Sequence, residues 1–465
     1  MWLNIDKNME ISIIRQIYQQ IKSMILEQKI LAGEKLPSTR WLSQNLKVSR
    51  NVVLEAYAQL MAEGYVESKM GSGTTVSKGI NFQINKVNVE EHFKNFKYEN
   101  DDNLIKFRSG IPALEMFPKK ELGRLFNNIY RDIPFSYFRY CDPEGKMELR
   151  QAISKYLFRI RGINCKPQQI MIVSGSTQGL SLISKLLYSR EKEAIVEDPV
   201  HYGLLKVISS QGYLINPVPV DNKGMRTDMI KTENDVGFVY VTPSHQFPLG
   251  GVLPIQRRIE LIKFAEKKDC YIIEDDYDSE FRYEGQPISS VYELNPNRVI
   301  YIGSFSKILA PALRLGYILL PEALIPEYLN LKMYSDVHTE SISQLVLAKF
   351  INEGKLERHI LKMKKEYCKK RQALIKSLNY NFAGEYTIEG EAAGLHLVVQ
   401  FKNILFTEDI MKKIIKEKVK VYPVEKYSIH KGRHNNKIIL GYGHLSVEQI
   451  EEGIKRIRRA IKEKL

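Results

Sequence analysis

A nine-residue stretch, Val299–Lys307, constrains what this chain can fold into more than any other. Its first four residues are apolar, β-branched or aromatic, a pattern that predicts a buried strand. Gly303 ends that strand, and Ser304, Ser306 and Lys307 follow at once. A strand end that delivers a lysine into a protein interior points to a nucleophile, because burial lowers the pKa of the amine and frees it to form a Schiff base.

The residues around this lysine suggest what it reacts with. Ser304 and Ser306 supply two hydroxyls, and Arg314 supplies a cation seven residues after Lys307. Hydroxyls and an arginine are the groups that bind a phosphate. Together they predict pyridoxal phosphate (PLP) bound through Lys307. The alternative interpretation is a surface lysine in a loop, with Pro311 preventing a regular helix just beyond it.

A second strand end strengthens the cofactor interpretation. Cys270–Ile273 predicts a short strand, which leads into Glu274, Asp275, Asp276 and Tyr277. PLP needs a carboxylate beside its pyridinium nitrogen and a donor near its phenolic oxygen, and Asp275 and Tyr277 fit those roles. The alternatives are an acidic metal loop and a solvated turn. No His or Cys stands here at metal-ligand spacing, so we expect no metal site.

Length and composition bound the remaining possibilities. At 465 residues the chain exceeds one typical domain, and two or three domains are expected. The net charge of +15 permits an anionic partner such as DNA, although residues 1–78 carry only +3, from ten basic and seven acidic side chains. The four cysteines form no CxxC pair, which argues against a disulfide framework and a zinc site. Because the sequence has neither a signal peptide nor an apolar run long enough for a membrane span, we expect a cytoplasmic protein without a membrane partner.

The first eighty residues carry the pattern of a helix-turn-helix. Isoleucines recur at helical spacing over 12–29, which predicts an amphipathic helix. Ser38 is expected to cap a short helix over 39–46, and Ser49 a second helix over 50–62, with a tight turn between them. In this motif the N-terminal end of the second helix enters the major groove. Arg50 and Asn51 stand at that end and are suited to bidentate contacts with guanine and adenine.

A glycine-rich hairpin is predicted directly after these helices, at 65–76. Its tip carries Lys69, Ser72 and Gly73 and is expected to approach a phosphate or the minor groove, as the wing of a winged helix does. The alternative is a generic three-helix module for protein interaction. Residues 79–103 are polar and aperiodic, and we interpret them as an extended, flexible linker.

Over residues 104–465, apolar strands alternate with helical runs, which is typical of an α/β domain with a covered, mostly parallel sheet. Ligands bind at the strand ends of such sheets. Ser176 and Thr177 follow one strand, in a small-residue turn that opens a helix and suits a phosphate. His201 follows a second strand and is expected to lie over a planar ring, or else to be an ordinary loop histidine. His245 follows a third strand and is expected to meet the phenolic oxygen.

Residues 1–78 resemble the winged-helix domain of GntR-type bacterial regulators. The resemblance is carried by Leu36–Arg40, Leu46–Val53, Leu60–Val66 and Gly71–Thr74. It implies that the following residues contact double-stranded DNA: Ser38, Arg40, Ser49, Arg50, Asn51, Lys69, Ser72 and Gly73.

Residues 104–465 resemble fold-type I aminotransferases through Thr242–Pro248, Glu274–Phe281 and Gly303–Lys307. A winged helix, a linker and this domain, in this order, are similar to the MocR regulators. The resemblance implies a large α/β sheet domain, a smaller C-terminal α+β domain and a head-to-tail homodimer. It implies Lys307 as the Schiff-base lysine of a PLP site. The implied site comprises Ser176, Thr177, His201, His245, Asp275, Tyr277, Ser304, Ser306, Lys307 and Arg314.

The chain departs from the aminotransferase pattern near its C-terminus. Aminotransferases hold the substrate carboxylate there with an arginine, and His444 stands where that arginine is expected, as the residue facing the effector. A neutral histidine cannot make the always-charged, bidentate clamp of arginine, which argues against a GABA-like or ordinary amino-acid effector. Three alternatives stay open: His444 binds a different group, Arg433 and His434 compensate, or PLP itself is the signal.

The sequence therefore favours a DNA-binding transcriptional regulator that senses a small amine, an amino acid or PLP through its C-terminal domain. The alternative is an active PLP-dependent aminotransferase joined to a DNA-binding module, which the missing arginine makes less favoured. A third hypothesis, a dimer scaffold without PLP, is disfavoured by the near-complete set of cofactor residues.

Overall fold

The structure, a computed structural model, describes residues 3–69, 73–79, 103–189 and 191–462. The chain falls into two compact units, Met1–Asn100 and Asp101–Leu465, which are described separately. The predicted linker, 79–103, lies outside the described residues apart from its two end positions.

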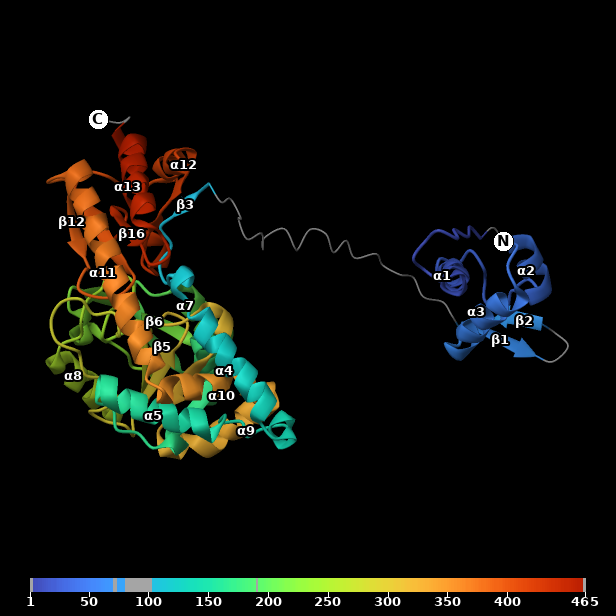
Figure 1. Ribbon diagram of the computed structural model, residues 1–465, viewed down its shortest axis with the longest axis horizontal. Helices are drawn as coiled ribbons and strands as arrows, with labels where there is room; N and C mark the ends of the chain where they lie inside the picture. Colours follow the sequence, from blue (N-terminus) through green and yellow to red (C-terminus); the bar gives the residue numbers. More distant parts are fainter. Residues whose placement is uncertain (1–2, 70–72, 80–102, 190, 463–465) are drawn as a thin grey trace. The chain divides into compact units, whose positions relative to one another are not determined.

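Among its described residues, the N-terminal unit has three helices and a two-stranded hairpin (Figure 1). Ile17, Ile21, Val53 and Leu60 are fully buried and pack together in its core, as their helical spacing predicts. The elements are α1 (Ile13–Leu26), α2 (Thr39–Leu46), α3 (Arg50–Ala62), β1 (Val66–Lys69) and β2 (Gly73–Val76).

The helix ends test the predicted caps. The hydroxyl of Ser38 accepts a hydrogen bond from the backbone N–H of Trp41 at 3.2 Å and caps α2 as expected. Ser49 stands at the same position of α3, but its hydroxyl makes no capping hydrogen bond, so that part of the prediction is wrong. The first helix is shorter than predicted because Gln28 adopts a left-handed backbone conformation, with φ of 57°, which is incompatible with a continuing helix.

The hairpin pairs β1 and β2 antiparallel, from Val66 opposite Val76 to Lys69 opposite Gly73. Thr75 also bridges to Lys35 on its other side, which ties the hairpin to the segment before α2. The predicted tip residue Ser72 lies outside the described residues. A hairpin directly after the second helix of the motif is the wing that the sequence predicts.

The C-terminal unit is built on an eight-stranded mixed sheet with the order β4-β11-β10-β9-β8-β5-β6-β7. Strands β6, β5, β8, β9 and β10 run parallel to their neighbours in the middle of the sheet, whereas β11 and β7 run antiparallel to theirs. The bounds are β4 (Ile170–Val173), β5 (Glu193–Asp198), β6 (Leu214–Asp221), β7 (Gly224–Met225), β8 (Val236–Val241), β9 (Tyr271–Asp276), β10 (Val299–Ser304) and β11 (Gly316–Leu319).

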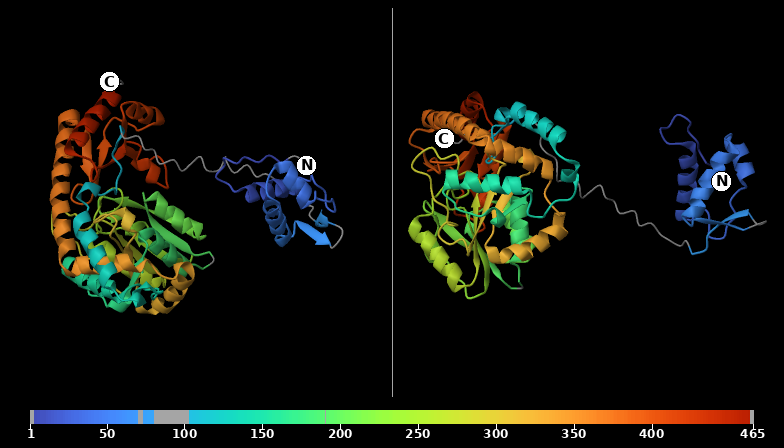
Figure 2. Two further views of the ribbon diagram at one scale, coloured as in Figure 1. Left: turned by 45° about the vertical axis from the view of Figure 1, so that its right-hand side comes forward. Right: turned by 60° about the horizontal axis from the view of Figure 1, so that its bottom comes forward.

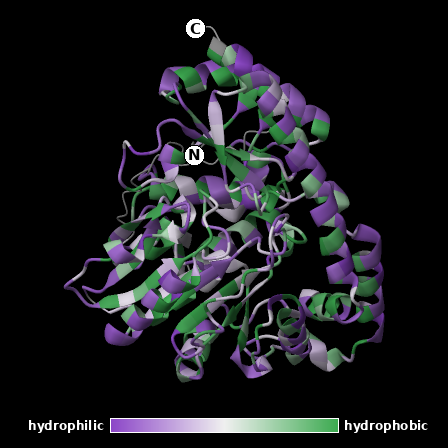
Figure 3. Cartoon of the chain, turned by 90° about the vertical axis from the view of Figure 1, so that its left-hand side faces the viewer, coloured by the Kyte–Doolittle hydropathy of each residue, from purple (hydrophilic) through white to green (hydrophobic). Residues whose placement is uncertain are grey.

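Helices cover both faces of this sheet, and its strands carry the most hydrophobic residues of the unit (Figures 2 and 3). Successive residues of one strand join different apolar cores: Ile272 belongs to the cluster on one face and Ile273 to the cluster on the other. This double burial explains why the strands read as continuous apolar runs. The covering helices are α4 (Lys119–Asp132), α5 (Met147–Arg161), α6 (Ser176–Leu186), α7 (Tyr202–Ser210), α8 (Ile255–Lys267), α9 (Ile325–Asp336) and α10 (Ser341–Asn352).

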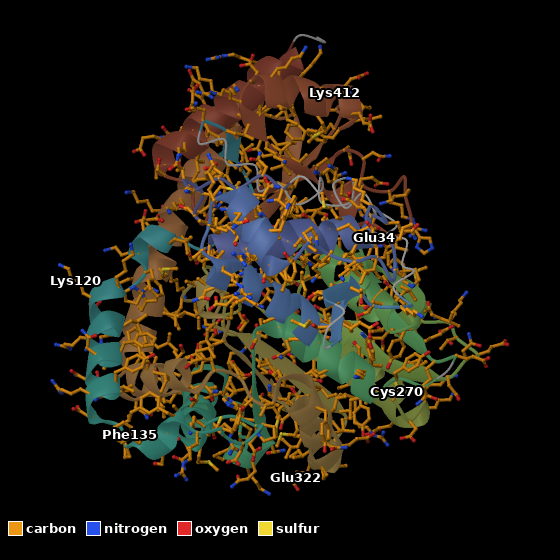
Figure 4. The ribbon with its side chains drawn as sticks, turned by 90° about the vertical axis from the view of Figure 1, so that its right-hand side faces the viewer. Glu34, Lys120, Phe135, Cys270, Glu322 and Lys412 are labelled. Atoms are coloured by element: carbon orange, nitrogen blue, oxygen red, sulfur yellow. The ribbon has the colours of Figure 1, made fainter. Side chains whose placement is uncertain are left out.

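A smaller α+β subdomain completes this unit, as the resemblance to fold-type I aminotransferases implies. The long helix α11 leads into it from the helices of the large subdomain (Figure 1). Lys412 on this subdomain and Glu322 on the large one lie at opposite ends of the unit (Figure 4). Its antiparallel sheet has the order β12-β13-β16-β15. The elements are α11 (Lys355–Phe382), β12 (Tyr386–Glu389), β13 (His396–Phe401), α12 (Glu408–Lys416), β15 (Tyr422–Pro423), β16 (Lys437–Gly441) and α13 (Val447–Lys462).

The start of the C-terminal unit joins the small subdomain before the chain enters the large one. Strand β3 (Ile105–Lys106) pairs parallel with β14 (Val419–Lys420), and Phe107, which follows it, is fully buried. Within the described part of the chain, no helix is both long and apolar enough to cross a membrane.

Candidate functional site

A cavity of about 230 Å³ lies at the carboxyl ends of the parallel strands β5, β8, β9 and β10. This is the edge at which open α/β sheets bind ligands. The residues that line it come from positions far apart in the chain: Ser109, Ser176, Thr177, Glu197, Val200, His201, Leu204, Tyr240, Thr242, Phe247, Asp275, Tyr277, Ser304, Ser306, Lys307, Pro311 and Arg314.

Lys307 enters the cavity from the turn after β10. Its amine donates a hydrogen bond to the carbonyl oxygen of Gly110 at 2.5 Å. Burial lowers the pKa of Lys307, the carboxylates of Asp278 and Asp275 oppose that effect, and the charges of Arg108 and Arg314 add to it. A lowered pKa raises the fraction of neutral amine, which is the form that attacks a carbonyl.

Asp275, at the end of β9, presents a buried carboxylate to the cavity. Its Oδ2 accepts a hydrogen bond from the hydroxyl of Tyr240 at 2.6 Å. Its Oδ1 is buried and has no hydrogen-bond partner among the described residues. Burial raises the pKa of Asp275 to about 6, the Tyr240 hydrogen bond opposes this, and the neighbouring Asp276 adds to it. A buried acceptor without a donor fits a ligand that brings an N–H group to it.

Tyr277 lines the cavity, and His245 lies behind it. The Tyr277 hydroxyl donates to the backbone carbonyl of His245 at 3.0 Å and lies 3.1 Å from its Nδ1. His245 Nδ1 lies 3.0 Å from Asp278 Oδ2, and the ring is buried. Burial lowers the pKa of His245, but the Asp278 carboxylate outweighs it and leaves the pKa raised. His245 is therefore a positioning group for Tyr277, and the expectation that it reaches the cavity itself is not met.

One end of the cavity gathers hydroxyls, backbone N–H groups and a cation. Ser176 and Thr177 are the first residues of α6, so they belong to the helix itself and not to the turn before it, and the N-terminus of the helix points at the cavity. Ser304 accepts a hydrogen bond from the backbone N–H of Ser306 at 3.1 Å. Arg314 donates to the carbonyl oxygen of Ser174 at 2.6 Å. A phosphate group suits this end of the cavity.

These residues fit PLP. Asp275 would offer a buried carboxylate to the ring nitrogen, Lys307 would offer its amine to the aldehyde, and the N-terminus of α6 with its neighbouring hydroxyls would hold the phosphate. Two glycines make room for this arrangement. A Cβ on Gly110 would lie 2.9 Å from the Lys307 amine, and a Cβ on Gly175 would lie 2.8 Å from the Arg314 guanidinium; both glycines have positive φ.

His201 is the N-cap residue of α7 and lines the cavity, with its ring 5.4 Å from that of Phe247 in an edge contact. The loss of water around the ring lowers the pKa of His201, and the charges of Lys307 and Arg108 add to this. The ring is thus neutral at neutral pH, which suits an apolar contact with a planar ligand.

Sequence reasoning missed Glu197, the second-last residue of β5, which lines the cavity. Its carboxylate accepts hydrogen bonds from the Thr242 hydroxyl at 2.6 Å and the Thr242 N–H at 3.2 Å. Burial raises the pKa of Glu197 to about 7, the Thr242 hydrogen bonds oppose this, and Asp275 adds to it. The strand-end rule was sufficient to find Glu197. No local signal marks Ser109 or Tyr240, because their roles depend on contacts between distant segments.

His444 does not line the cavity. It follows β16, and its Nδ1 is buried without a hydrogen-bond partner among the described residues. Burial lowers the pKa of His444, a hydrogen bond to the backbone of Lys106 opposes this, and Lys370 adds to it. The residue that replaces the expected arginine is therefore a neutral group at neutral pH.

The predicted DNA-contacting residues lie on the N-terminal unit. Arg50 and Asn51 are exposed in the first turn of α3, and Ser49 stands just before it. Arg40 is exposed on α2, and Ser38 caps that helix. Lys69 and Gly73 are the paired ends of the wing strands. The free hydroxyl of Ser49 leaves it available for a phosphate.

Comparison with known proteins agrees with both units. Residues 13–76 match the bacterial regulatory proteins of the gntR family, and residues 122–457 match the aminotransferases of class I and II. The solved structure of the α-aminoadipate aminotransferase LysN from Thermus thermophilus, complexed with N-(5'-phosphopyridoxyl)-L-leucine, superimposes with a TM-score of 0.70. It is 27% identical, and the match covers 78% of this chain and 93% of that chain. The fold and site thus define an aminotransferase-like protein joined to a winged helix.

Relatives over the full length make the assignment more specific. An uncharacterized HTH-type transcriptional regulator of Bacillus subtilis, YdeL, is 34% identical over 98% of both chains. The probable rhizopine catabolism regulatory protein MocR of Rhizobium meliloti is 29% identical over 98% of this chain and 95% of its own. The chain belongs to the MocR-type transcriptional regulators, in which a gntR winged helix precedes an aminotransferase class I and II domain.

Proposed function

We propose that this chain is a PLP-binding transcriptional regulator that acts on operator DNA in the cytoplasm. In this proposal residues 1–78 bind DNA, 79–103 link the parts, and 104–465 bind the cofactor and effector and form a head-to-tail homodimer. The observation that supports it most is the cavity that combines a lysine amine, an orphaned buried carboxylate and a phosphate cradle, in a chain that begins with a gntR winged helix.

Each cavity residue has a separate task. PLP, when bound, supplies a reactive aldehyde and a ring that accepts electrons. Lys307 would hold it covalently, and the lowered pKa of its amine favours that bond. Asp275 would hold the ring proton at pH values above about 6, where its carboxylate is ionised. Tyr277, fixed by His245, would donate to the phenolic oxygen, and Arg314 would neutralise the phosphate.

The effector in this proposal is a small amine or amino acid, or PLP itself. An amine that competes with Lys307 for the cofactor gives the domain a second state with different contacts, as a ligand-controlled switch requires. Two winged helices carried by a dimer would read paired half-sites, and their spacing would respond to that switch.

Two variants of the full-length protein test the proposal on a promoter fragment. In the wild type we expect a visible absorption band with PLP, and a DNA affinity that changes when an effector amine or further PLP is added. The Lys307→Ala variant should keep its effector-free DNA affinity but lose both the covalent band and the response. The Arg50→Ala variant should keep the band and lose about 10- to 100-fold in DNA affinity. An unchanged effector response in Lys307→Ala refutes the proposal.

A further inference from the structure

Arg108 is a cation that directly precedes Ser109, a cavity residue, and it is not one of the residues assigned above to the cofactor. It belongs to the segment 107–113, which runs from the small subdomain to Lys307. At one end of that segment the carbonyl of Phe107 accepts a hydrogen bond from the N–H of Gly441 at 3.0 Å. At the other end the carbonyl of Gly110 accepts from the Lys307 amine at 2.5 Å, and Ser109 between them lines the cavity.

The charge of Arg108 acts on groups in and near the cavity. Burial lowers the pKa of Lys307 and of His201, and the Arg108 charge adds to both shifts. Burial raises the pKa of Tyr427, and the Arg108 charge opposes that shift. The rings of Tyr427 and His201 lie 6.3 Å apart. Arg108 does not itself line the cavity, but it directly precedes Ser109, which does, and its charge acts on Lys307 and His201, which line the cavity, and on Tyr427 and His444, which do not.

This cation has no partner in the described part of the chain. Arg108 is exposed and makes no ion pair or side-chain hydrogen bond there. Arg314, the other arginine whose charge acts on Lys307, donates instead to the carbonyl of Ser174 and lies at the phosphate end. Lys307 is therefore flanked by two arginines, of which one serves the phosphate and one is unengaged.

We propose that Arg108 binds the carboxylate of an amino-acid effector whose amine lies at Lys307. It would take over the task of the arginine that His444 replaces, from a different segment of the chain. An arginine supplies the permanent charge and the bidentate donors that a carboxylate needs, and the neutral His444 supplies neither. This inference rests on the proposed PLP site, and it narrows the effector class from any amine to amines that carry a carboxylate.

The test compares reduced cofactor conjugates that cannot turn over. Phosphopyridoxyl conjugates of glycine, β-alanine and 4-aminobutanoate are titrated calorimetrically into the full-length, PLP-free protein. Each is matched with the conjugate of the corresponding alkylamine, which lacks only the carboxylate. We expect at least one carboxylated conjugate to bind about tenfold more tightly than its alkylamine match. Tenfold is the lower end of the range for a charge-assisted hydrogen bond, and it applies here because Arg108 is exposed to water. The preference should weaken with added salt.

The Arg108→Gln variant should lose this preference while binding the alkylamine conjugates as the wild type does, and Arg108→Lys should restore part of it. Arg433→Gln changes the exposed arginine that the sequence left as the rival candidate, and this variant should keep the preference. Thermal unfolding of Arg108→Gln should match that of the wild type, because the side chain has no partner to lose.

The other outcomes overturn the inference. If the wild type binds both conjugates of each pair equally, the effector needs no carboxylate and this inference fails. The proposed PLP site would still be supported, because the conjugates bind. If Arg433→Gln and not Arg108→Gln removes the preference, the carboxylate lies elsewhere. If no conjugate binds the wild type at all, the PLP site itself is wrong, and the inference falls with it.

Discussion

We predict that the hydrogen bond from Tyr240 to Asp275 sets the pH range in which the site binds PLP. Asp275 has a pKa of about 6, so its carboxylate is about 90% ionised at pH 7. The Tyr240 hydroxyl is its one donor among the described residues, at 2.6 Å. A hydrogen bond to a charged group contributes about 1.5 to 3 kcal/mol. Since 1.36 kcal/mol corresponds to a tenfold change, the Tyr240→Phe variant should raise the pKa of Asp275 by about 1 to 2.

The consequence is a shift of the pH dependence of PLP binding. In the wild type, PLP affinity should fall as pH falls through about 6, because protonated Asp275 no longer accepts the ring proton. In Tyr240→Phe only about a half to a tenth of the carboxyl groups are ionised at pH 7, so affinity should already fall between pH 8 and 7. The measurement is an absorbance titration of PLP-free protein with PLP between pH 5.5 and 8.5. Ionisations of PLP itself cancel in the comparison of the two proteins.

Tyr301→Phe is the matched control. The Tyr301 hydroxyl donates to Asp276 Oδ2, also at 2.6 Å and also buried, but Asp276 does not line the cavity. Both variants lose a buried hydroxyl and should be destabilised, and only Tyr240→Phe should move the pH midpoint of PLP binding. If Tyr240→Phe is folded and its midpoint equals that of the wild type, Asp275 does not hold the ring nitrogen.

Two further predictions concern stability. Burial raises the pKa of Glu197 from 4.5 to about 7, so the free energy of unfolding of the PLP-free protein should fall by up to about 3 kcal/mol as pH rises from 4.5 through 7. Glu197→Gln should therefore be more stable than the wild type in urea at pH 8. An equal gain in stability at pH 5 would contradict this cause. Ser38 caps α2 and Ser49 makes no cap, so Ser38→Ala should lower the unfolding free energy of the N-terminal unit by about 1 kcal/mol. Ser49→Ala should change the unfolding free energy of this unit by less than about 0.5 kcal/mol. Hydrogen exchange of α2 and α3 in the full chain measures both changes. Comparable losses in the two variants would show that the two serines cap their helices equally.

Local pattern was sufficient where one strand or helix decides the outcome. The apolar run before Lys307 forms β10, and the run before Asp275 forms β9, because strands buried on both faces leave an unbroken apolar signature. Their polar ends meet in one cavity because parallel strands share a carboxyl edge. The winged helix was predictable because its helices are short and the breaks between them are marked in the sequence.

Contacts between distant segments left no such signature. Gly110 lies 197 residues from Lys307, and no periodicity marks the turn that brings its carbonyl to the amine. The position of His245 outside the cavity lining depends on its contact with Asp278, which holds the ring next to Tyr277. Ser49 shows the limit even within a helix start: sequence selects the cap position, but the hydroxyl torsion that makes the bond depends on its surroundings.

The contact between Lys307 and Gly110 links the occupancy of the site to the way the chain enters this unit. Lys307 donates to Gly110 through the amine that the cofactor or an effector engages. Gly110 lies on the segment 103–113, the first described residues of the C-terminal unit, which β3 ties to the small subdomain. In the proposed function, a ligand that takes over the amine would remove this hydrogen bond, and a ligand that displaces Lys307 from the cofactor would restore it. The two states would therefore differ by one hydrogen bond to the entry segment, which is the part of this unit nearest in sequence to the winged helix. The free energy of that hydrogen bond would be available to couple ligand binding to the position of this segment.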